Sequence, residues 1–329
     1  MRYLRNFIAK GTGALLCLLL ALTQAQPRLS ALRQEGTSQQ SVRPASMQLE
    51  DLLDRAAART IEYTDIFKDL MAEERQLIEL YDSSGQLMRR RRITSDFVVY
   101  QSQLDSKLMV EYRNVREVDG AAVADRQERV MSLAERLVKV DSVTKELDRI
   151  DREASRYDLN YSVKGYTLNQ GMALQKEVRA AFRFEAAGRE MLDGHEVVRI
   201  NYQQIAQHPQ IKFNLSLPKI KSSSPLYRGR LWLDAETAQL WREEREIVVR
   251  LPKLADPVAL MSFEFRYAPS KFKILVPHRI VFTTLGSIKR VEGQPPILSP
   301  GGRVSFEYGS FEQFDVTVKP GSFTPQNPQ

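Results

Sequence analysis

Three histidines are the side chains of this sequence best suited to metal binding or acid–base chemistry. His195, His208 and His278 lie far apart in the sequence, so a metal site built from them needs carboxylates that converge from distant segments. The sequence contains no GxSxG, P-loop, HExxH or GxGxxG motif. We therefore expect ordinary structural histidines, and we expect neither a metal nor a cofactor.

Adjacent carboxylates are the other candidates for acid–base work. Glu73-Glu74 and Glu243-Glu244 each place two carboxylates side by side in the sequence, and general acid–base catalysis needs such groups close in space. Neighbouring residues of a strand, however, point to opposite faces of a sheet, so neither pair can face one site. We expect ion pairs instead, with Arg242 and Arg245 as cross-strand partners of Glu243-Glu244.

The densest basic run is formed by four consecutive arginines, Arg89, Arg90, Arg91 and Arg92. On a strand two of them point to each face, which is hard to bury, so the run predicts an exposed or edge strand. Arginines at an edge also discourage pairing with other chains. The functional alternative is contact with anionic lipid head groups or another polyanion.

Five aromatic residues of the C-terminal half are the candidate ligand-binding set. They are Trp232, Trp241, Phe263, Phe265 and Tyr267. Residues 261–268 alternate between apolar and polar side chains, which predicts a strand with one buried face. We expect the two tryptophans to face each other across one hairpin. The set can line an apolar cavity or pack beneath helices as a closed core, and both arrangements produce the same pattern.

The chain around these residues is dominated by strand patterns. Apolar residues at three- and four-residue spacing predict a helix from about Met47. A second helical stretch covers roughly 125–157, and Asp141 or Ser142 can cap the start of its apolar stripe. Beyond residue 160 nearly every segment is predicted to be a strand, and Asp193-Gly194 predicts a two-residue hairpin turn.

About eleven strands in hairpin order predict an antiparallel meander rather than a parallel sheet. The breaks at Pro218–Pro225 and Pro295–Gly302 are predicted to be loops. A sheet of this size curls, and helices can fill its concave face. The predicted fold class is therefore α+β and mostly antiparallel, a curved half-open barrel with helices packed on the concave face.

One hairpin resembles known proteins. Gly229-Arg230-Leu231-Trp232-Leu233-Asp234-Ala235-Glu236-Thr237, followed by Leu240-Trp241-Arg242, resembles the central hairpin of the periplasmic LolA, LolB and RseB superfamily. Leu275-Val276-Pro277-His278-Arg279-Ile280 resembles a later strand of these lipoprotein carriers and sensors. The resemblance implies a half-open barrel over helices that holds acyl chains or hydrophobic peptide segments. The helical insert near 125–157 is longer than a simple carrier needs, and it could be a lid, a plug or a partner surface.

The region of roughly 60–285 also resembles a family of secreted bacterial proteins in which no catalytic residue is assigned. The matching pieces are Ser95-Asp96-Phe97, Glu117-Val118-Asp119-Gly120, Asp125-Arg126-Gln127-Glu128-Arg129, Glu153-Ala154-Ser155-Arg156-Tyr157, Gly188-Arg189-Glu190 and Asp193-Gly194. This resemblance implies a shared fold and transfers no active site.

The N-terminus predicts a secretory signal peptide over residues 1–25. Arg2, Arg5 and Lys10 precede the apolar run Ala14–Leu22, and Ala25 ends a plausible cleavage site. The run is too short to span a membrane as a helix. We expect a flexible leader over 26–46, one domain over 47–318 and a disordered tail over 319–329. The expected location is the periplasm, with peripheral membrane contact at most.

Charge and cysteine content narrow the function classes. The formal net charge of +7 falls to +4 once the three basic residues of the n-region are removed, so nucleic-acid binding is not expected. Cys17 is the one cysteine of the chain and belongs to the predicted signal peptide, which excludes an internal disulfide and a cysteine zinc site.

Three functions follow from these patterns. The first is a non-enzymatic envelope protein that holds a lipid, an acyl chain or a lipoprotein in the concavity of the sheet. The second is an interaction or structural module of the envelope, with a filled cavity and an exposed strand edge for a partner protein. The least favoured is a hydrolase of envelope material, because no nucleophile–base pair is visible.

Overall fold

The computed structural model describes residues 45–313, except 103, 106–107, 139–140, 160, 162–164, 212–223, 253, 255 and 290–296. The predicted signal peptide and tail lie outside the described residues, as does the predicted leader up to residue 44. The first helix, α1, spans Ala45–Phe67 and so begins two residues before the predicted start at Met47.

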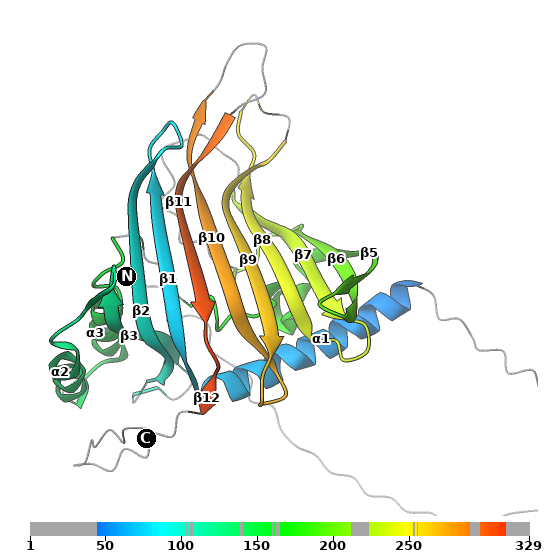
Figure 1. The fold of residues 1–329 in the computed structure, drawn as a ribbon. Coiled ribbons are helices and arrows are strands. Elements are labelled where there is room, and N and C mark those ends of the chain that lie inside the picture. Colours follow the sequence, from blue (N-terminus) through cyan, green and yellow to red (C-terminus); the bar gives the residue numbers. More distant parts are fainter. Residues whose placement is uncertain are drawn as a thin grey trace, which may run out of the picture.

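The strands form one open antiparallel sheet (Figure 1). They are β1 (Leu70–Tyr81), β2 (Leu87–Gln101), β3 (Met109–Val118), β4 (Ala121–Ala122), β5 (Phe182–Leu192), β6 (His195–Gln204), β7 (Leu226–Asp234), β8 (Leu240–Val249), β9 (Val258–Pro269), β10 (Leu275–Lys289), β11 (Ile297–Tyr308) and β12 (Glu312–Gln313). Their order is β4-β3-β2-β1-β11-β10-β9-β8-β7-β6-β5, and β12 pairs with β1. This confirms the predicted curved, mostly antiparallel fold.

Helix α1 covers one face of this sheet, which we call the covered face, and the opposite face is the open face. Figure 1 shows α1 lying behind the sheet. Its apolar stripe, which includes Leu53, Tyr63 and Phe67, is buried in a core to which the strands from β1 to β11 contribute. The short helices η1 (Met172–Leu174) and α4 (Lys176–Arg179) follow the same covered face.

The predicted helical insert forms two helices, α2 (Arg126–Val138) and α3 (Val143–Ala154). Of the two predicted caps, Ser142 is the N-cap of α3, since its side chain accepts a hydrogen bond from the Lys145 N–H. The α3 stripe packs through Leu147 and Ile150 on Val110 and Tyr112 of β3. These β3 residues alternate with Glu111 and Arg113, which face the main core, so the helical pair lies on the opposite side of β3 from that core. The pair is therefore neither a lid nor a plug of the covered face.

The residues of the turn between β5 and β6 determine how this hairpin closes. Asp193 and Gly194 have φ values of 50° and 84°, the left-handed pair that a two-residue hairpin turn requires. The turn joins β5 to β6 in the predicted register, with Leu192 opposite His195.

The predicted loop at Pro295–Gly302 is wrong from Ile297 onward, because β11 begins there. Pro300 is accommodated where the β10–β11 register shifts around Leu285. Gly286 and Gly301 then let the two backbones approach, since a Cβ on Gly286 would lie 2.6 Å from the Gly301 Cα. Proline and two glycines together therefore mark a bulge rather than a break in the strand.

Candidate binding site

Charged side chains form rows across the open face of β7, β8 and β9. Alternation along each strand sends these residues to the open face: Arg228, Arg230, Arg242, Glu244, Glu246, Glu264 and Arg266. The register places Arg230 opposite Glu244 and Arg228 opposite Glu246. Opposite charges therefore meet across the β7–β8 pair, which stabilises this register.

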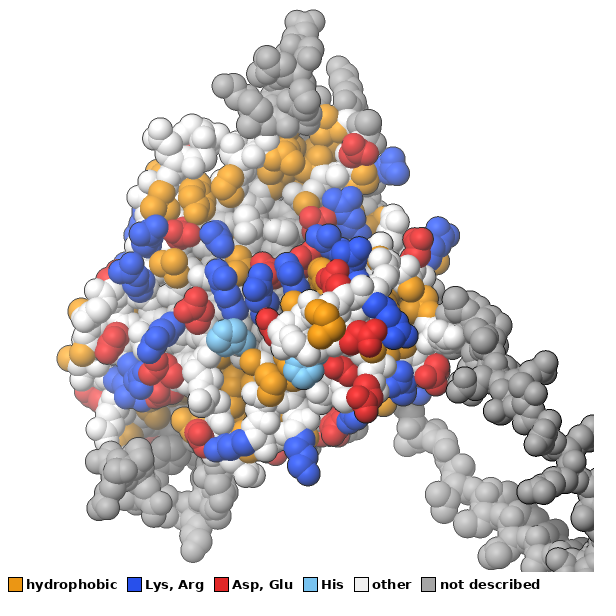
Figure 2. Space-filling view, turned by 45° about the vertical axis from the view of Figure 1, so that its right-hand side comes forward, with side chains coloured by type: hydrophobic (Ala, Val, Ile, Leu, Met, Phe, Trp, Pro, Cys, Tyr) orange, Lys and Arg blue, Asp and Glu red, His pale blue; other side chains and the backbone are white. Residues whose placement is uncertain are grey.

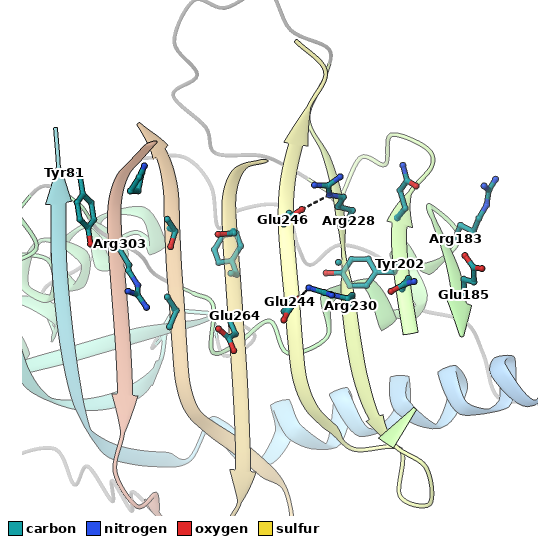
Figure 3. Close-up of a pocket in the computed structure, with 18 residues that line it drawn as sticks. Tyr81, Arg183, Glu185, Tyr202, Arg228, Arg230, Glu244, Glu246, Glu264 and Arg303 are labelled. Carbon is teal, nitrogen blue, oxygen red and sulfur yellow. Dashed lines mark hydrogen bonds and ion pairs between the residues drawn. The ribbon is translucent and has the colours of Figure 1, made fainter. Parts of the chain in front are cut away.

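The rows are joined by ion pairs (Figure 3). The Arg228 Nε lies 2.6 Å from a Glu246 oxygen, and Arg230 pairs with Glu244. Glu244 and Glu264 are direct register partners on β8 and β9, a repulsive arrangement on its own. One guanidinium relieves it, because the Arg242 Nη2 lies 2.6 Å from Glu244 and 3.1 Å from Glu264.

The arginines also set the protonation of Glu264. Partial burial raises its pKa, but the hydrogen bond from Arg266 and the charges of Arg266 and Arg242 lower it more, so the pKa of Glu264 lies below the ordinary value of 4.5. The carboxylate is therefore ionised at neutral pH, and the charge pattern of the open face persists there.

A hollow of about 970 Å³ lies over these rows. Residues from β5, β6, β7, β8, β9, β10, β11 and β1 line it, and its charged members are Arg183, Glu185, Arg228, Arg230, Glu244, Glu246, Glu264 and Arg303. Figure 3 shows them along the sheet, with Arg183 and Glu185 on the edge strand β5. Basic and acidic side chains are also interspersed over the surface drawn in Figure 2. Four positive and four negative groups give the hollow no net charge.

The covered face, in contrast, is filled in the part of the chain that the structure describes. Leu231 and Val304 have no exposed surface, and Phe265 and Ile280 are 1% and 2% exposed. A cavity large enough for water would expose its walls, so none lies beside these side chains. The cleft between α1 and β8 at Tyr63 measures about 10 Å³, too small for an acyl chain.

Two buried ion-pair clusters hold the polypeptide that fills this face. On β8, both Glu243 oxygens accept hydrogen bonds from Arg245, at 2.8 and 2.9 Å, and the two side chains are 0% and 4% exposed. The Glu243 carboxylate also accepts from the Gly171 N–H, and Arg245 donates to the Asn169 carbonyl. The Tyr202 hydroxyl donates to Glu243 at 3.0 Å. The cluster thus pins residues 169–171 to the sheet.

The second cluster lies on β1 and β3. Arg113 donates to Glu74 at 2.6 Å and to Glu111 at 3.1 Å. Burial lowers the pKa of Arg113, but the carboxylates of Glu74 and Glu111 raise it more, so it lies well above its ordinary value. Glu111 also accepts hydrogen bonds from the Thr167 N–H and hydroxyl. Both clusters therefore form hydrogen bonds with one segment, residues 167–171, from opposite halves of the sheet.

The aromatic candidates lie in the packed structure rather than around the hollow, apart from Phe263, which borders both. Phe263, Phe265 and Tyr267 form a ladder along β9, with ring centroids 6.0 and 6.5 Å apart and nearly parallel planes. All three are at most 5% exposed. Of the two arrangements left open by the sequence, these rings adopt the closed core.

The expectation that the tryptophans face each other is wrong. A register shift after Trp232 pairs that residue with Arg242 instead of Trp241, so the two tryptophans are not cross-strand partners. Trp232 lies between the guanidinium groups of Arg230 and Arg242, at 5.7 and 4.7 Å from its ring centroid. Trp241 instead stacks on His195 at 4.1 Å.

The arginine run lies at the start of β2, where the strand pairs with β1 but not yet with β3, whose pairing begins at Ile93. Arg89, Arg90 and Arg92 are exposed, while Arg91 is half-buried and donates to the Tyr157 carbonyl. Only this end of β2 is a local edge. The role of the run in binding an anionic surface stays a prediction.

The carboxylate pairs divide between the two faces. Glu243 is buried in the core, whereas Glu244 lies on the open face. Their partners Arg245 and Arg242 lie two residues away on the same strand, not across the sheet, and Arg230 is the cross-strand partner of Glu244. Among the described residues no group of three His, Cys, Asp or Glu side chains is placed to hold a metal ion.

Comparisons with known proteins give structural likenesses alone. No family model and no curated protein matches the chain. Similar solved structures include a DUF1329 family protein from Desulfovibrio piger (10% identity, 83% of this chain and 95% of the other, TM-score 0.32). A LolA superfamily protein from Nitrosomonas europaea is also similar (7%, 81% and 94%, TM-score 0.33), as is lipoprotein LppX of Mycobacterium tuberculosis (8%, 82% and 99%, TM-score 0.25). These likenesses carry no conclusion about a ligand.

Proposed function

We propose that this chain is a binding protein of the bacterial envelope whose site is the open-face hollow, and that it takes a polypeptide segment carrying charges of both signs. The observation that carries the proposal is the hollow itself, with four arginines and four glutamates, opposite a covered face filled by the chain's own side chains. Export rests on the predicted signal peptide.

The size of the hollow favours a polypeptide over a small ligand. It spans eight adjacent strands, which corresponds to roughly 34 Å across the sheet. The volume of about 970 Å³ on its own would also suit a small molecule, whose pockets measure about 300–1,000 Å³ but are mostly apolar, so the width and the charged lining carry this preference. The balanced charges also disfavour a polyanion such as nucleic acid, which needs a basic surface.

The hollow opens at one sheet edge. Strand β5 is the last strand of the order on that side, most of its residues are exposed, and Arg183 and Glu185 belong both to this edge and to the hollow. An extended partner segment can add to such an edge by main-chain hydrogen bonds. Its side chains then reach the charged rows next to the edge, which supplies the specificity.

Site-specific photo-crosslinking in bacteria that export the protein tests this proposal. A photoreactive residue is placed at Ser262 or Thr283, which line the hollow, and at exposed Glu128 on α2 as the control. We expect a discrete protein adduct from the hollow positions, and its loss when Arg228→Glu and Arg230→Glu reverse the charges. Adducts from Glu128 alone, or adducts that survive the charge reversal, contradict the proposal.

A hydrophobic carrier is the second candidate. The observation in its favour is that Tyr161 and residues 165–174, which form no long helix, pack on the covered face beside α1, with Tyr161 and Tyr166 on Phe282. Displacement of this segment would uncover an apolar surface that includes Phe263. In that case the protein must take up lipid, and the hydrogen bonds that Thr167 and Gly171 donate to Glu111 and Glu243 must break first.

A further inference from the structure

Exposed apolar residues gather at the end of the sheet where β1 turns into β2, where β10 ends and where β11 begins, at the top of Figure 1. Leu87 and Met88 at the start of β2 are 44% and 67% exposed, and Leu298 at the start of β11 is 47% exposed. Single exposed apolar residues are common on soluble proteins. Three large ones at the same end of one sheet are more informative.

Contacts show that these strand ends are adjacent. The Ser287 hydroxyl of β10 donates to the Ser83 carbonyl in the β1–β2 turn at 3.0 Å. A Cβ on Gly85 of that turn would lie 3.8 Å from the Ser299 hydroxyl of β11. The turn therefore rests on the tips of β10 and β11, which brings Leu87 and Met88 to the same rim as Leu298.

A separate apolar cluster continues this surface along the neighbouring strand ends. Val249, Leu251 and Val258 are its buried members, and Leu285 and Ile288 pack against them partly exposed. Val249 ends β8, Leu251 follows it, and the others belong to the adjoining ends of β9 and β10; none is part of the main core. The rim is thus backed by apolar packing instead of resting on polar loops.

Basic side chains follow the apolar ones along the start of β2. Arg89, Arg90 and Arg92 are exposed, and Arg90 keeps 48% of its side chain in solvent although it pairs with Glu79 at 2.8 Å. Apolar side chains that enter the acyl boundary, next to arginines that stay at the head groups, are the combination that holds peripheral proteins on anionic membranes.

We propose that this rim, formed by Leu87, Met88, Leu298, Arg89, Arg90 and Arg92, docks the protein on an anionic phospholipid bilayer. Met88 and Leu298 enter the interface, and the arginines contact the lipid phosphates. The hollow borders the rim through Tyr81 and Pro300, so a docked protein holds its partner segment next to the membrane surface. The docking does not depend on the function assigned to the hollow.

Vesicle co-sedimentation tests the proposal with the purified protein. We expect binding to vesicles of phosphatidylglycerol and phosphatidylcholine in equal parts, and little binding to phosphatidylcholine alone. Replacing Arg89 and Arg92 by Gln should weaken binding about 30-fold, since each basic residue near an anionic surface contributes a factor of about five. The matched control is Lys145→Gln with Arg152→Gln on α3, which removes the same charge away from the rim and should leave binding unchanged.

A fluorescent label separates insertion from simple charge attraction. Cys17 is the one cysteine of the chain, so Cys17→Ser with Met88→Cys gives a single labelling site, and Met131→Cys on α2, 53% exposed, is the control. We expect an environment-sensitive dye at position 88, and not at 131, to shift to the blue on anionic vesicles. The proposal would be overturned if the protein bound both vesicle types equally, or failed to bind anionic vesicles even at low salt. It would also be overturned if the Arg89/Arg92 variant and the Lys145/Arg152 variant lost the same binding, or if the dye at position 88 did not shift.

Discussion

Replacement of Glu243 by Gln offers the sharpest perturbation of the covered face. Glu243 has no exposed surface, and its two oxygens accept four hydrogen bonds, two from Arg245 and one each from Tyr202 and Gly171. The variant leaves the Arg245 guanidinium buried without a counter-charge, which costs about 3–5 kcal/mol of unfolding free energy. For a domain of this size, that corresponds to a fall in melting temperature of about 10 °C.

The same strand supplies the matched control. Glu244 is the next residue and forms ion pairs with Arg230 and Arg242, but on the open face, where such pairs contribute at most about 1 kcal/mol. Glu244→Gln should therefore shift the melting temperature by only a few degrees. Thermal unfolding followed by circular dichroism measures both variants.

A double-mutant cycle decides whether the charge pair is the cause. Arg245→Met alone also leaves one buried charge, whereas Glu243→Gln with Arg245→Met leaves none, and the amide oxygen can still accept from Gly171. We expect the double variant to be more stable than either single variant. Additive losses, or equal losses for Glu243→Gln and Glu244→Gln, would refute the assignment of these two residues to opposite faces.

Three further outcomes follow from the structure. Gly286→Ala at this exposed position should lower the unfolding free energy by about 1–3 kcal/mol in denaturant unfolding, because the new Cβ meets the Gly301 backbone. Gly309→Ala, where the nearest neighbour lies 3.6 Å away, should cost less than 1 kcal/mol, and equal effects of the two variants would contradict the close approach. Ser142→Ala removes the α3 cap, worth about 1 kcal/mol, and should speed amide exchange in α3 about fivefold, while an unchanged rate would argue against the cap. The folded-state pKa of Glu264 is depressed, so its ion pairs stabilise the fold fully above about pH 4.5 and are lost as the pH falls further. The difference in unfolding free energy between the wild type and Glu264→Gln should therefore shrink from pH 6 to pH 3.5, and a constant difference would contradict these ion pairs.

The sequence predicts the elements of this fold well because its local signals are consistent. The spacing of Leu53, Tyr63 and Phe67 predicts α1, alternation predicts the long strands, and Asp193-Gly194 predicts its hairpin. The position of β11 next to β1 is not predictable in this way, since no local signal specifies a pairing between strands more than two hundred residues apart. The extent of β11 was also missed, because Pro300 and its neighbouring glycines indicate a loop unless the β10 bulge is known.

The site was less predictable than the fold. The charged rows could have been found from alternation, since Arg228 and Arg230 precede the hairpin at the same distance as Glu244 and Glu246 follow it. The pairing of the tryptophans could not be predicted, because a register shift after Trp232 places Arg242 rather than Trp241 opposite it. The filling of the covered face depends on irregular residues, Tyr161 and 165–174, whose side chains show no period that sequence analysis can detect.

Among the described residues no helix is long and apolar enough to cross a membrane. Peripheral docking at the rim and lipid uptake beneath the sheet are separate properties. The two are distinguished by where lipid binds: at an external bilayer surface, or as single molecules retained inside the protein.

Native mass spectrometry of the protein purified from an envelope extract tests the central claim most directly. If the covered face is filled and the partner binds on the open face, the protein released from its partner has the mass of the bare polypeptide, and titration with phospholipid or fatty acid adds no retained molecule. A stoichiometric lipid adduct that survives collisional activation, and that increases when Glu243→Gln loosens residues 169–171, would contradict the account and establish the carrier in its place.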